Sequence, residues 1–206
     1  DAALLCHVAY VIDGQPYCTP TIHWREGDWL FWHGSSASRM LKSQKSGIPV
    51  CLTVAHLDGL VLARSGFHHS ANYRSAMCFG TAHIIDDPEE KAEALKAVVD
   101  RFYPGRTDVL RENDPQEAKG TMVIGMRIEE ASAKVRAGGV SDDPADVDAR
   151  VWAGVIPVET RLRAPEICPK VPEGVTFPDH LAHFQEGRRL DEVLTEAQAI
   201  YEKRTD

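Results

Sequence analysis

The chain has 206 residues, of which 43% are hydrophobic and 26% charged, as expected for a globular protein with one main core. The formal net charge of −8 and the pI near 5.6 argue against a nucleic-acid-binding protein, which would carry a basic surface. No apolar run approaches the roughly 20 residues that a membrane-spanning helix requires, so neither nucleic acid nor a membrane is an expected partner.

The cysteines and the first residues indicate the cellular compartment. Five cysteines, an odd number with no CxxC spacing, predict buried reduced thiols in a cytoplasmic protein, and no zinc site. Residues 1–12 are apolar but lack a basic segment, so they do not resemble a signal peptide. Because the chain begins directly in strand-like sequence, its first residue is not expected to be the natural start.

The first third predicts three short antiparallel strands. They cover residues 4–12, 16–24 and 29–33, with a hairpin turn at Asp13-Gly14 and a turn at residues 26–28. Such a meander indicates a mainly β fold and not a βαβ unit.

A helix is expected over about 36–46, after Gly34 ends the third strand. Small hydroxyls at Ser35, Ser36 and Ser38, with Arg39 in the first turn, fit a site for a phosphate monoester at the helix N-terminus. Taken alone, the same residues are more typical of an ordinary N-cap.

The middle third predicts three further strands and an insert. Residues 50–56 and 60–67 are expected to form a hairpin around Asp58-Gly59, and residues 76–85 another strand. Residues 68–75 form a polar insert between apolar strands. Gly80 indicates a bend or a close backbone approach, of the kind that closes a sheet into a barrel.

The last part adds helices and two strands. Asp87-Pro88 predicts a helix over 87–102, followed by a short helix near 115–119, a strand at 120–128, a charged loop at 129–150 and a strand at 151–160. A terminal helix is expected near 188–203. We therefore divide the chain into a barrel, residues 1–162, and a C-terminal helical extension, residues 163–206, packed on the barrel or on a partner subunit.

This order of motifs resembles the FMN-binding split barrels related to pyridoxamine 5′-phosphate oxidase, especially the branch of nitroimidazole-resistance and flavin-nucleotide-binding proteins. The resemblance covers about residues 4–160 and is carried by HGSSASRMLK (33–42), HLDGLVLARSGFHHSANYRSAMCFG (56–80), PEEKAEAL (88–95), ASAKVR (131–136) and VWAGVIP (151–157). It implies a six- to eight-stranded antiparallel split barrel with flanking helices, which binds FMN at the interface of a homodimer.

The resemblance also implies roles for individual residues. The FMN phosphate would lie at Ser38 and Arg39, with Lys42 in place of the lysine that often follows this pair. The remaining contacts to the ribityl chain and the ring would come from Thr21, Ile22, His23, His33, Gly34, Tyr73, Arg74 and Ser75, and from Trp152 of the second subunit.

Several of these residues have simpler explanations. Trp152 in an apolar strand could belong to the core, Arg74 could cap a loop carbonyl, and Ser75 could be a turn residue. Lys134 and Arg136 could be a solvated charge pair or could hold the loop over the cofactor.

The nine histidines include two candidates for catalysis. His68 or His69 would lie where a substrate meets the flavin, as a proton donor or substrate contact, or would make only a structural hydrogen bond. The sequence does not decide which of the two faces the flavin. His180-x-x-His183 lacks an accompanying carboxylate motif, so no metal site is expected.

Together these patterns predict a cytoplasmic, FMN-dependent oxidoreductase acting on a small molecule. The alternative is a non-catalytic protein that binds or stores a flavin or haem, with His68, His69 or a C-terminal histidine as the haem ligand. The sequence names neither the substrate nor the electron donor.

Overall fold

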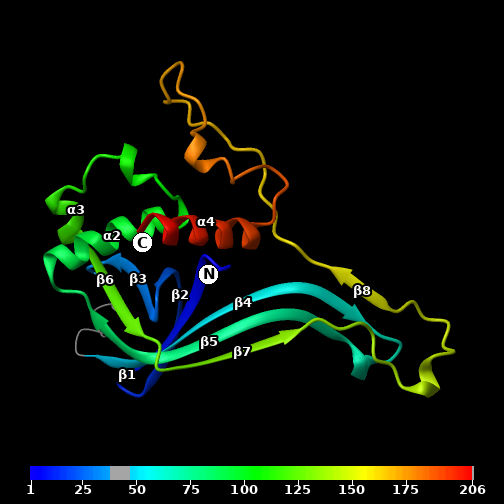
Figure 1. Cartoon of the computed structure of the whole chain (residues 1–206). Helices are drawn as coiled ribbons and strands as arrows, with labels where there is room; N and C mark the ends of the chain where they lie inside the picture. Colours follow the sequence, from blue (N-terminus) through cyan, green and yellow to red (C-terminus); the bar gives the residue numbers. More distant parts are fainter. Residues whose placement is uncertain (38–46, 206) are drawn as a thin grey trace.

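The computed structural model describes residues 1–37 and 47–205. The expected helix over 36–46, with Ser38, Arg39 and Lys42, therefore lies almost entirely outside the described residues. The rest is mainly β, as predicted: one eight-stranded antiparallel sheet in the order β7-β5-β6-β3-β2-β1-β4-β8, with helices against one side (Figure 1).

The sheet closes on itself because β4 also pairs with β5. The strands are β1 (Leu5–Ile12), β2 (Gln15–Glu26), β3 (Trp29–Ser35), β4 (Ile48–Leu62), β5 (Ser70–Ile84), β6 (Thr121–Arg127), β7 (Glu130–Arg136) and β8 (Gly154–Pro157). The inner halves of β4 and β5 belong to the barrel. Their outer halves continue beyond it as a long ribbon flanked by β7 and β8 (Figure 1). We call this extension the ribbon.

Barrel closure depends on Gly80, where the sequence indicated a bend or a close approach. A Cβ atom there would lie 2.2 Å from the carbonyl oxygen of Arg127 and 2.8 Å from Cγ of Met126. Only glycine therefore lets the end of β6 approach β5 this closely.

Two apolar clusters stabilise the fold. The first fills the barrel, with Val8, Leu30, Trp32, Leu52 and Met126 among its buried members. The second lies between the barrel and the helices α2 (Pro88–Phe102) and α4 (Leu190–Thr205), and contains Trp24, Val98, Phe102, Val123 and Leu194. The C-terminal helix thus packs on the barrel of its own chain, while the domain boundary at residue 162 stays a prediction.

Asp58-Gly59 was wrongly predicted to be a hairpin turn. Both residues lie inside β4, at a bulge, and Gly59 is needed because β8 approaches it: its Cβ would lie 3.1 Å from Cγ1 of Val155 and 3.3 Å from the carbonyl oxygen of Ile156. The separate strands expected at 50–56 and 60–67 are therefore one strand, which ends at Leu62.

Three other boundaries also differ from the prediction. Most of the polar insert at 68–75 belongs to β5, which starts at Ser70 after the 3-10 turn η1 (Gly66–His68). The loop expected over 129–150 contains β7, an exposed edge strand whose alternating residues on one side are small or exposed: Ala131, Ala133 and Val135. The last strand is confined to β8, because residues 151–153 and 158–160 have no strand structure. The short helix α3 (Pro115–Gly120) is as predicted.

Candidate functional site

One face of β1, β4, β5 and β7 is open to solvent in the single chain. Cross-strand pairing and the alternation of side chains along each strand place ten residues on this side. We call it the open face: Leu5, His7, Cys51, Thr53, Leu57, Tyr73, Ser75, Met77, Phe79 and Lys134. Four of its large apolar side chains remain between 37% and 61% exposed: Leu5, Leu57, Met77 and Phe79. An apolar surface with a few polar groups is typical of a binding or subunit interface.

Tyr73 and Ser75 lie together on this open face. Ser75 pairs with Lys134 of β7, and Nζ of Lys134 lies 5.7 Å from the centre of the Tyr73 ring. A hydrogen bond with Tyr73 raises the pKa of Lys134, so its ammonium is charged at neutral pH. Arg136, in contrast, donates to Oδ1 of Asn72 at 2.6 Å, which holds β7 against β5.

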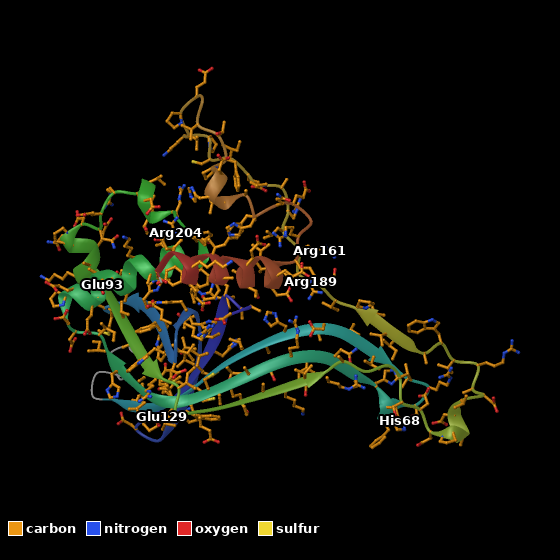
Figure 2. The ribbon with its side chains drawn as sticks, viewed as in Figure 1. His68, Glu93, Glu129, Arg161, Arg189 and Arg204 are labelled. Atoms are coloured by element: carbon orange, nitrogen blue, oxygen red, sulfur yellow. The ribbon has the colours of Figure 1, made fainter. Side chains whose placement is uncertain are left out.

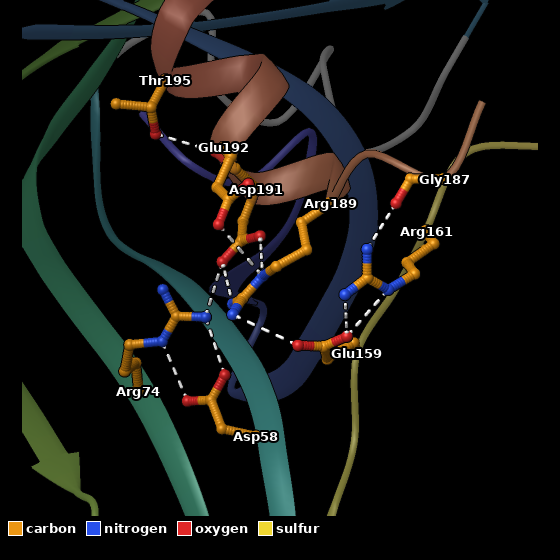
Figure 3. Close-up of polar contacts among 9 residues, drawn as sticks. All are labelled: Asp58, Arg74, Glu159, Arg161, Gly187, Arg189, Asp191, Glu192 and Thr195. Carbon is orange, nitrogen blue, oxygen red and sulfur yellow. Dashed lines mark hydrogen bonds and ion pairs between the residues drawn. The ribbon is translucent and has the colours of Figure 1, made fainter. Parts of the chain in front are cut away.

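Arg74, between Tyr73 and Ser75, points to the opposite side of β5. Its Nε and Nη2 donate to the carboxylate of Asp58 at 2.9 and 2.7 Å, and Nη2 also donates to Oδ2 of Asp191 at 2.9 Å (Figure 3). These hydrogen bonds raise the pKa of Arg74 and lower that of Asp58. Arg74 therefore binds two carboxylates, not the loop carbonyl considered above, and is not positioned beside Tyr73 and Ser75.

Asp191 extends this network into the C-terminal segment. Arg189 binds Asp191 at 2.8 Å and Glu159 at 3.6 Å, and hydrogen bonds from Arg189 and Arg74 hold the pKa of Asp191 well below its usual range. Main-chain bonds from Leu162 to Arg188 and from Leu190 to Thr160 join the same two segments. The ion pairs in Figure 3 thus attach the start of α4 to the ribbon.

A second group of predicted flavin contacts lies on β2 and β3. Thr21 and His23 face the barrel interior, since they pair with Cys6 and Trp32, whereas Ile22 faces outward beside Leu5. His23 is buried, which lowers its pKa to about 4. The buried Nδ1 atoms of His23 and His33 have no hydrogen-bond partner within the described part of the chain.

His33 and Gly34 pair with Val123 and Met122 of β6 near the end of β3. The structure thus brings His33 and Gly34 close to residues 21–23 on the neighbouring strand. In the closed sheet, β6 lies between β3 and β5, and β1 and β4 lie between β2 and β5 in the other direction.

His68 and His69 lie at the tip of the ribbon (Figure 2 labels His68). Nδ1 of His69 lies 2.9 Å from the carbonyl oxygen of Ser65. Because a carbonyl only accepts hydrogen bonds, Nδ1 carries the proton and Nε2 of the neutral ring keeps its lone pair. Nε2 of His68 is buried and lies 3.3 Å from a carboxylate oxygen of Asp143. The two rings therefore differ: His69 uses Nδ1 for its contact with the protein, whereas His68 directs Nε2 towards Asp143.

Large aromatic side chains are exposed along the ribbon. Phe67 is 91% exposed and stacks edge-on against His68, and Trp152 is 65% exposed. The indole of Trp152 lies over Gly154, where a Cβ would be 2.9 Å from Cζ2. The interpretation of Trp152 as a core residue is therefore wrong for the single chain.

Sequence reasoning missed Asp58 and Asp191 as members of these clusters, and it considered Lys134 only as part of a loop. Asp58 and Asp191 are distant in sequence and meet only because α4 folds back over the ribbon. Lys134 was placed in a loop because the segment around it is highly charged, and the alternation of Ala131, Ala133 and Val135 was the signal that could have revealed the strand.

Comparisons with known proteins were made for the sequence and for the fold. A model of the family described as "Pyridoxamine 5′-phosphate oxidase" matches residues 1–135. A search of curated proteins gave no significant match.

Among solved structures, the flavocytochrome Anf3 from Azotobacter vinelandii is 42% identical, with 89% of this chain and 86% of that chain covered and a TM-score of 0.82. A FAD and heme binding protein from Mycobacterium smegmatis is 38% identical, with 91% of each chain covered and a TM-score of 0.84.

A protein from Bacteroides thetaiotaomicron described as a 5-nitroimidazole antibiotic resistance protein shares the fold at 24% identity and a TM-score of 0.50, with 64% of this chain and 76% of that chain covered.

Within residues 1–37 and 47–205, no helix is both long and apolar enough to cross a membrane.

Proposed function

Because the chain belongs to the pyridoxamine 5′-phosphate oxidase family, we propose that it is a homodimeric oxidoreductase that binds a flavin and a haem and exchanges electrons with a small molecule. The observation that carries the proposal is the similarity, over about nine-tenths of the chain, to one protein named a flavocytochrome and to another named for FAD and heme. The flavin and haem would supply the redox chemistry, and the protein would bind and orient them.

The open face fits a flavin because it combines exposed apolar side chains with hydroxyls and one ammonium group. Tyr73, Ser75 and Lys134 would contact the ring system, and main-chain groups of residues 21–23, with the outward-facing Ile22, would reach its other edge. Ser38, Arg39 and Lys42 stay the predicted phosphate contacts. Arg74 would act indirectly, by fixing the strand that carries Tyr73 and Ser75.

The kind of flavin is a separate question. The resemblance implies FMN, whereas the relative from Mycobacterium smegmatis is named for FAD. Both flavins share the ring, the ribityl chain and the first phosphate, which are the parts that the predicted residues would contact. Chromatography of the flavin released by denaturation distinguishes FMN from FAD.

A second copy of the chain would complete this site. The open face leaves a bound ring uncovered on one side, and its apolar residues are of the kind that subunit interfaces bury. Trp152 would reach the flavin of the second subunit. Light scattering at several protein concentrations measures the expected dimer.

For the haem, the geometry favours His69 over His68 as the axial ligand. Haem iron binds an unprotonated ring nitrogen, and a hydrogen bond from the other nitrogen commonly orients such a ligand. His69 has this arrangement through Ser65, while Nε2 of His68 faces Asp143. His68 then stays the candidate for proton transfer to a substrate.

The absorption spectrum of the purified protein, recorded before and after anaerobic addition of NADPH, tests the proposal. We expect flavin bands together with a Soret band, and bleaching of the flavin if NADPH is the donor. A spectrum with neither chromophore, even after both cofactors are added, would overturn the proposal.

Bound cofactors that undergo no reduction by any donor would favour the alternative, a flavin or haem carrier.

A cytoplasmic location is part of the proposal and is supported by the five cysteines, all of which are free.

A further inference from the structure

A large cavity lies far from the ribbon tip, between β3 and the helices α2 and α4. It has a volume of about 690 Å³, which is within the usual range for small-molecule sites. Figure 2 shows Glu93 and Arg204, two of its lining residues, at the opposite end of the molecule from His68. None of the predicted flavin or haem contacts that the structure describes lines this cavity.

Aromatic rings form one wall of the cavity. Trp29 and Phe31 alternate along β3 on the side that faces the helices, with ring centres 6.2 Å apart and 24° between their planes. Phe31 in turn stacks on the buried Trp24 at 5.4 Å. The buried Trp24 therefore holds Phe31 in place, and the outer ring of the stack, Trp29, stays 40% exposed.

Small residues on α2 keep the space open. Ala94 and Ala97 are the small residues among those of α2 that line the cavity. On the sheet side, Gly125 of β6 lets Phe31 lie close to the backbone, because a Cβ there would be 3.1 Å from Cε1 of Phe31.

The other walls carry an excess of negative charge. The lining contains five carboxylates and two basic side chains: Glu26, Glu90, Glu93, Asp100, Asp108, Lys96 and Arg204. Arg204 is bound to Asp108 at 2.6 Å, and Asp100 accepts hydrogen bonds from the main chain and hydroxyl of Thr107.

Three of the carboxylates, those of Glu26, Glu90 and Glu93, are left with only one further basic side chain in the lining, Lys96. No ion pair in the described part of the chain involves any of these three residues. Glu26 is fixed by the indole N–H of Trp24, which donates to its Oε1 at 3.0 Å. Burial raises the pKa of Glu26, and the negative charge of Glu93 raises it further. A cation bound near both carboxylates would favour their charged forms.

We propose that this cavity binds an organic cation with a flat apolar body, such as an aromatic ammonium or quaternary ammonium compound. The cationic group lies near Glu26 and Glu93, and the apolar body packs on Trp29, whose ring face also attracts positive charge. The proposal goes beyond the flavin and haem function and does not depend on it.

Calorimetric titration of the purified chain with benzyltrimethylammonium tests the site, with benzyl alcohol as the neutral and phenylacetate as the anionic comparison. We expect saturable binding of the cation only, with a Kd on the order of 1 mM or lower. Glu93→Gln should weaken it about three- to tenfold by removing one facing charge, and Trp29→Leu about three- to tenfold by removing the aromatic face. Glu173→Gln, on the exposed C-terminal segment, changes the net charge equally and should leave the Kd unchanged.

The outcomes are distinct from those of the cofactor experiments. The titration is run on protein as purified and on protein loaded with flavin and haem, and the Kd should be the same in both. Absence of saturable binding, equal binding of phenylacetate, or equal effects of Glu93→Gln and Glu173→Gln would each overturn the proposal. Since Glu93 is exposed, its substitution leaves the fold intact, and thermal unfolding of Trp29→Leu checks that variant.

Discussion

Replacement of Gly80 by alanine should strongly destabilise the barrel. The new Cβ would lie 2.2 Å from the carbonyl oxygen of Arg127, although such contacts are essentially never shorter than 3.0 Å. The strands would have to separate by roughly 0.8 Å, which would lengthen the nearby bond from Glu129 N to Phe79 O, now 2.9 Å, beyond the normal range.

The cost follows from these contacts. Losing one or two main-chain hydrogen bonds costs about 1–2 kcal/mol, and forcing extra volume into a packed site costs about 1–3 kcal/mol. Alanine restricts the unfolded chain and returns about 0.4–1 kcal/mol. The free energy of unfolding should therefore fall by about 1–5 kcal/mol.

Urea unfolding under reducing conditions measures this change, since all five cysteines are free. Gly120→Ala is the matched control, because no atom lies within 4 Å of its added Cβ and Gly120 ends the helix α3. It should leave the stability unchanged or raise it slightly. If the two variants unfold at the same urea concentration, closure of the barrel does not depend on Gly80.

Four further predictions address the site and its support. His69→Ala should abolish the Soret band while His68→Ala retains it; the reverse pattern in haem titrations would exchange their roles. Trp152→Ala should weaken the dimer and shift the flavin spectrum, and a stable dimer with an unchanged spectrum would remove it from the interface. Arg74→Met should lower the free energy of unfolding by about 1–2 kcal/mol, a value reduced because Arg74 is partly exposed; unchanged urea unfolding would contradict this. Burial lowers the pKa of His23 to about 4, below its unfolded value near 6.5, so the unfolded chain takes up this proton first as the pH falls. The contribution of neutral His23 to the free energy of unfolding is fully present above about pH 6.5 and falls by about 3 kcal/mol towards pH 4. If the free energy of unfolding of a His23→Gln variant falls as steeply between pH 6.5 and pH 4 as that of the unchanged chain, the assignment to His23 is refuted.

Local signals in the sequence predicted the elements whose structure is decided locally. Asp87 caps α2 through bonds to the main-chain N–H groups of Glu89 and Glu90, and Asp13-Gly14 has the positive φ angles that a tight hairpin needs. Gly80, a glycine within an apolar strand, lies where β6 closely approaches β5, as its position in the sequence indicated. In these cases the physical cause lies within a few residues of the signal.

The failures occur where a distant segment decides the structure. Asp58-Gly59 has the composition of a turn, yet Gly59 makes room for β8 and Asp58 binds Arg74. β7 is exposed along almost all of its length and forms by pairing with β5, so its alternating residues Ala131, Ala133 and Val135 give only a weak apolar signal. The separation of Arg74 from Tyr73 and Ser75 follows from strand alternation, but only once residues 70–75 are known to be strand.

The side-chain alternation along the two long strands of the ribbon restricts how many residues can be inserted or deleted there. β4 and β5 each run from the barrel to the tip, with 15 residues apiece. Apart from the bulge at Asp58 in β4, their side chains alternate with a period of two. Loss of one residue from β5 inside the barrel-proximal half would turn Tyr73 and Ser75 towards α4 and expose Arg74. Loss of two residues from each strand would shorten the ribbon by roughly 7 Å and keep both faces intact. Homologous ribbons should therefore differ in length by even numbers of residues per strand.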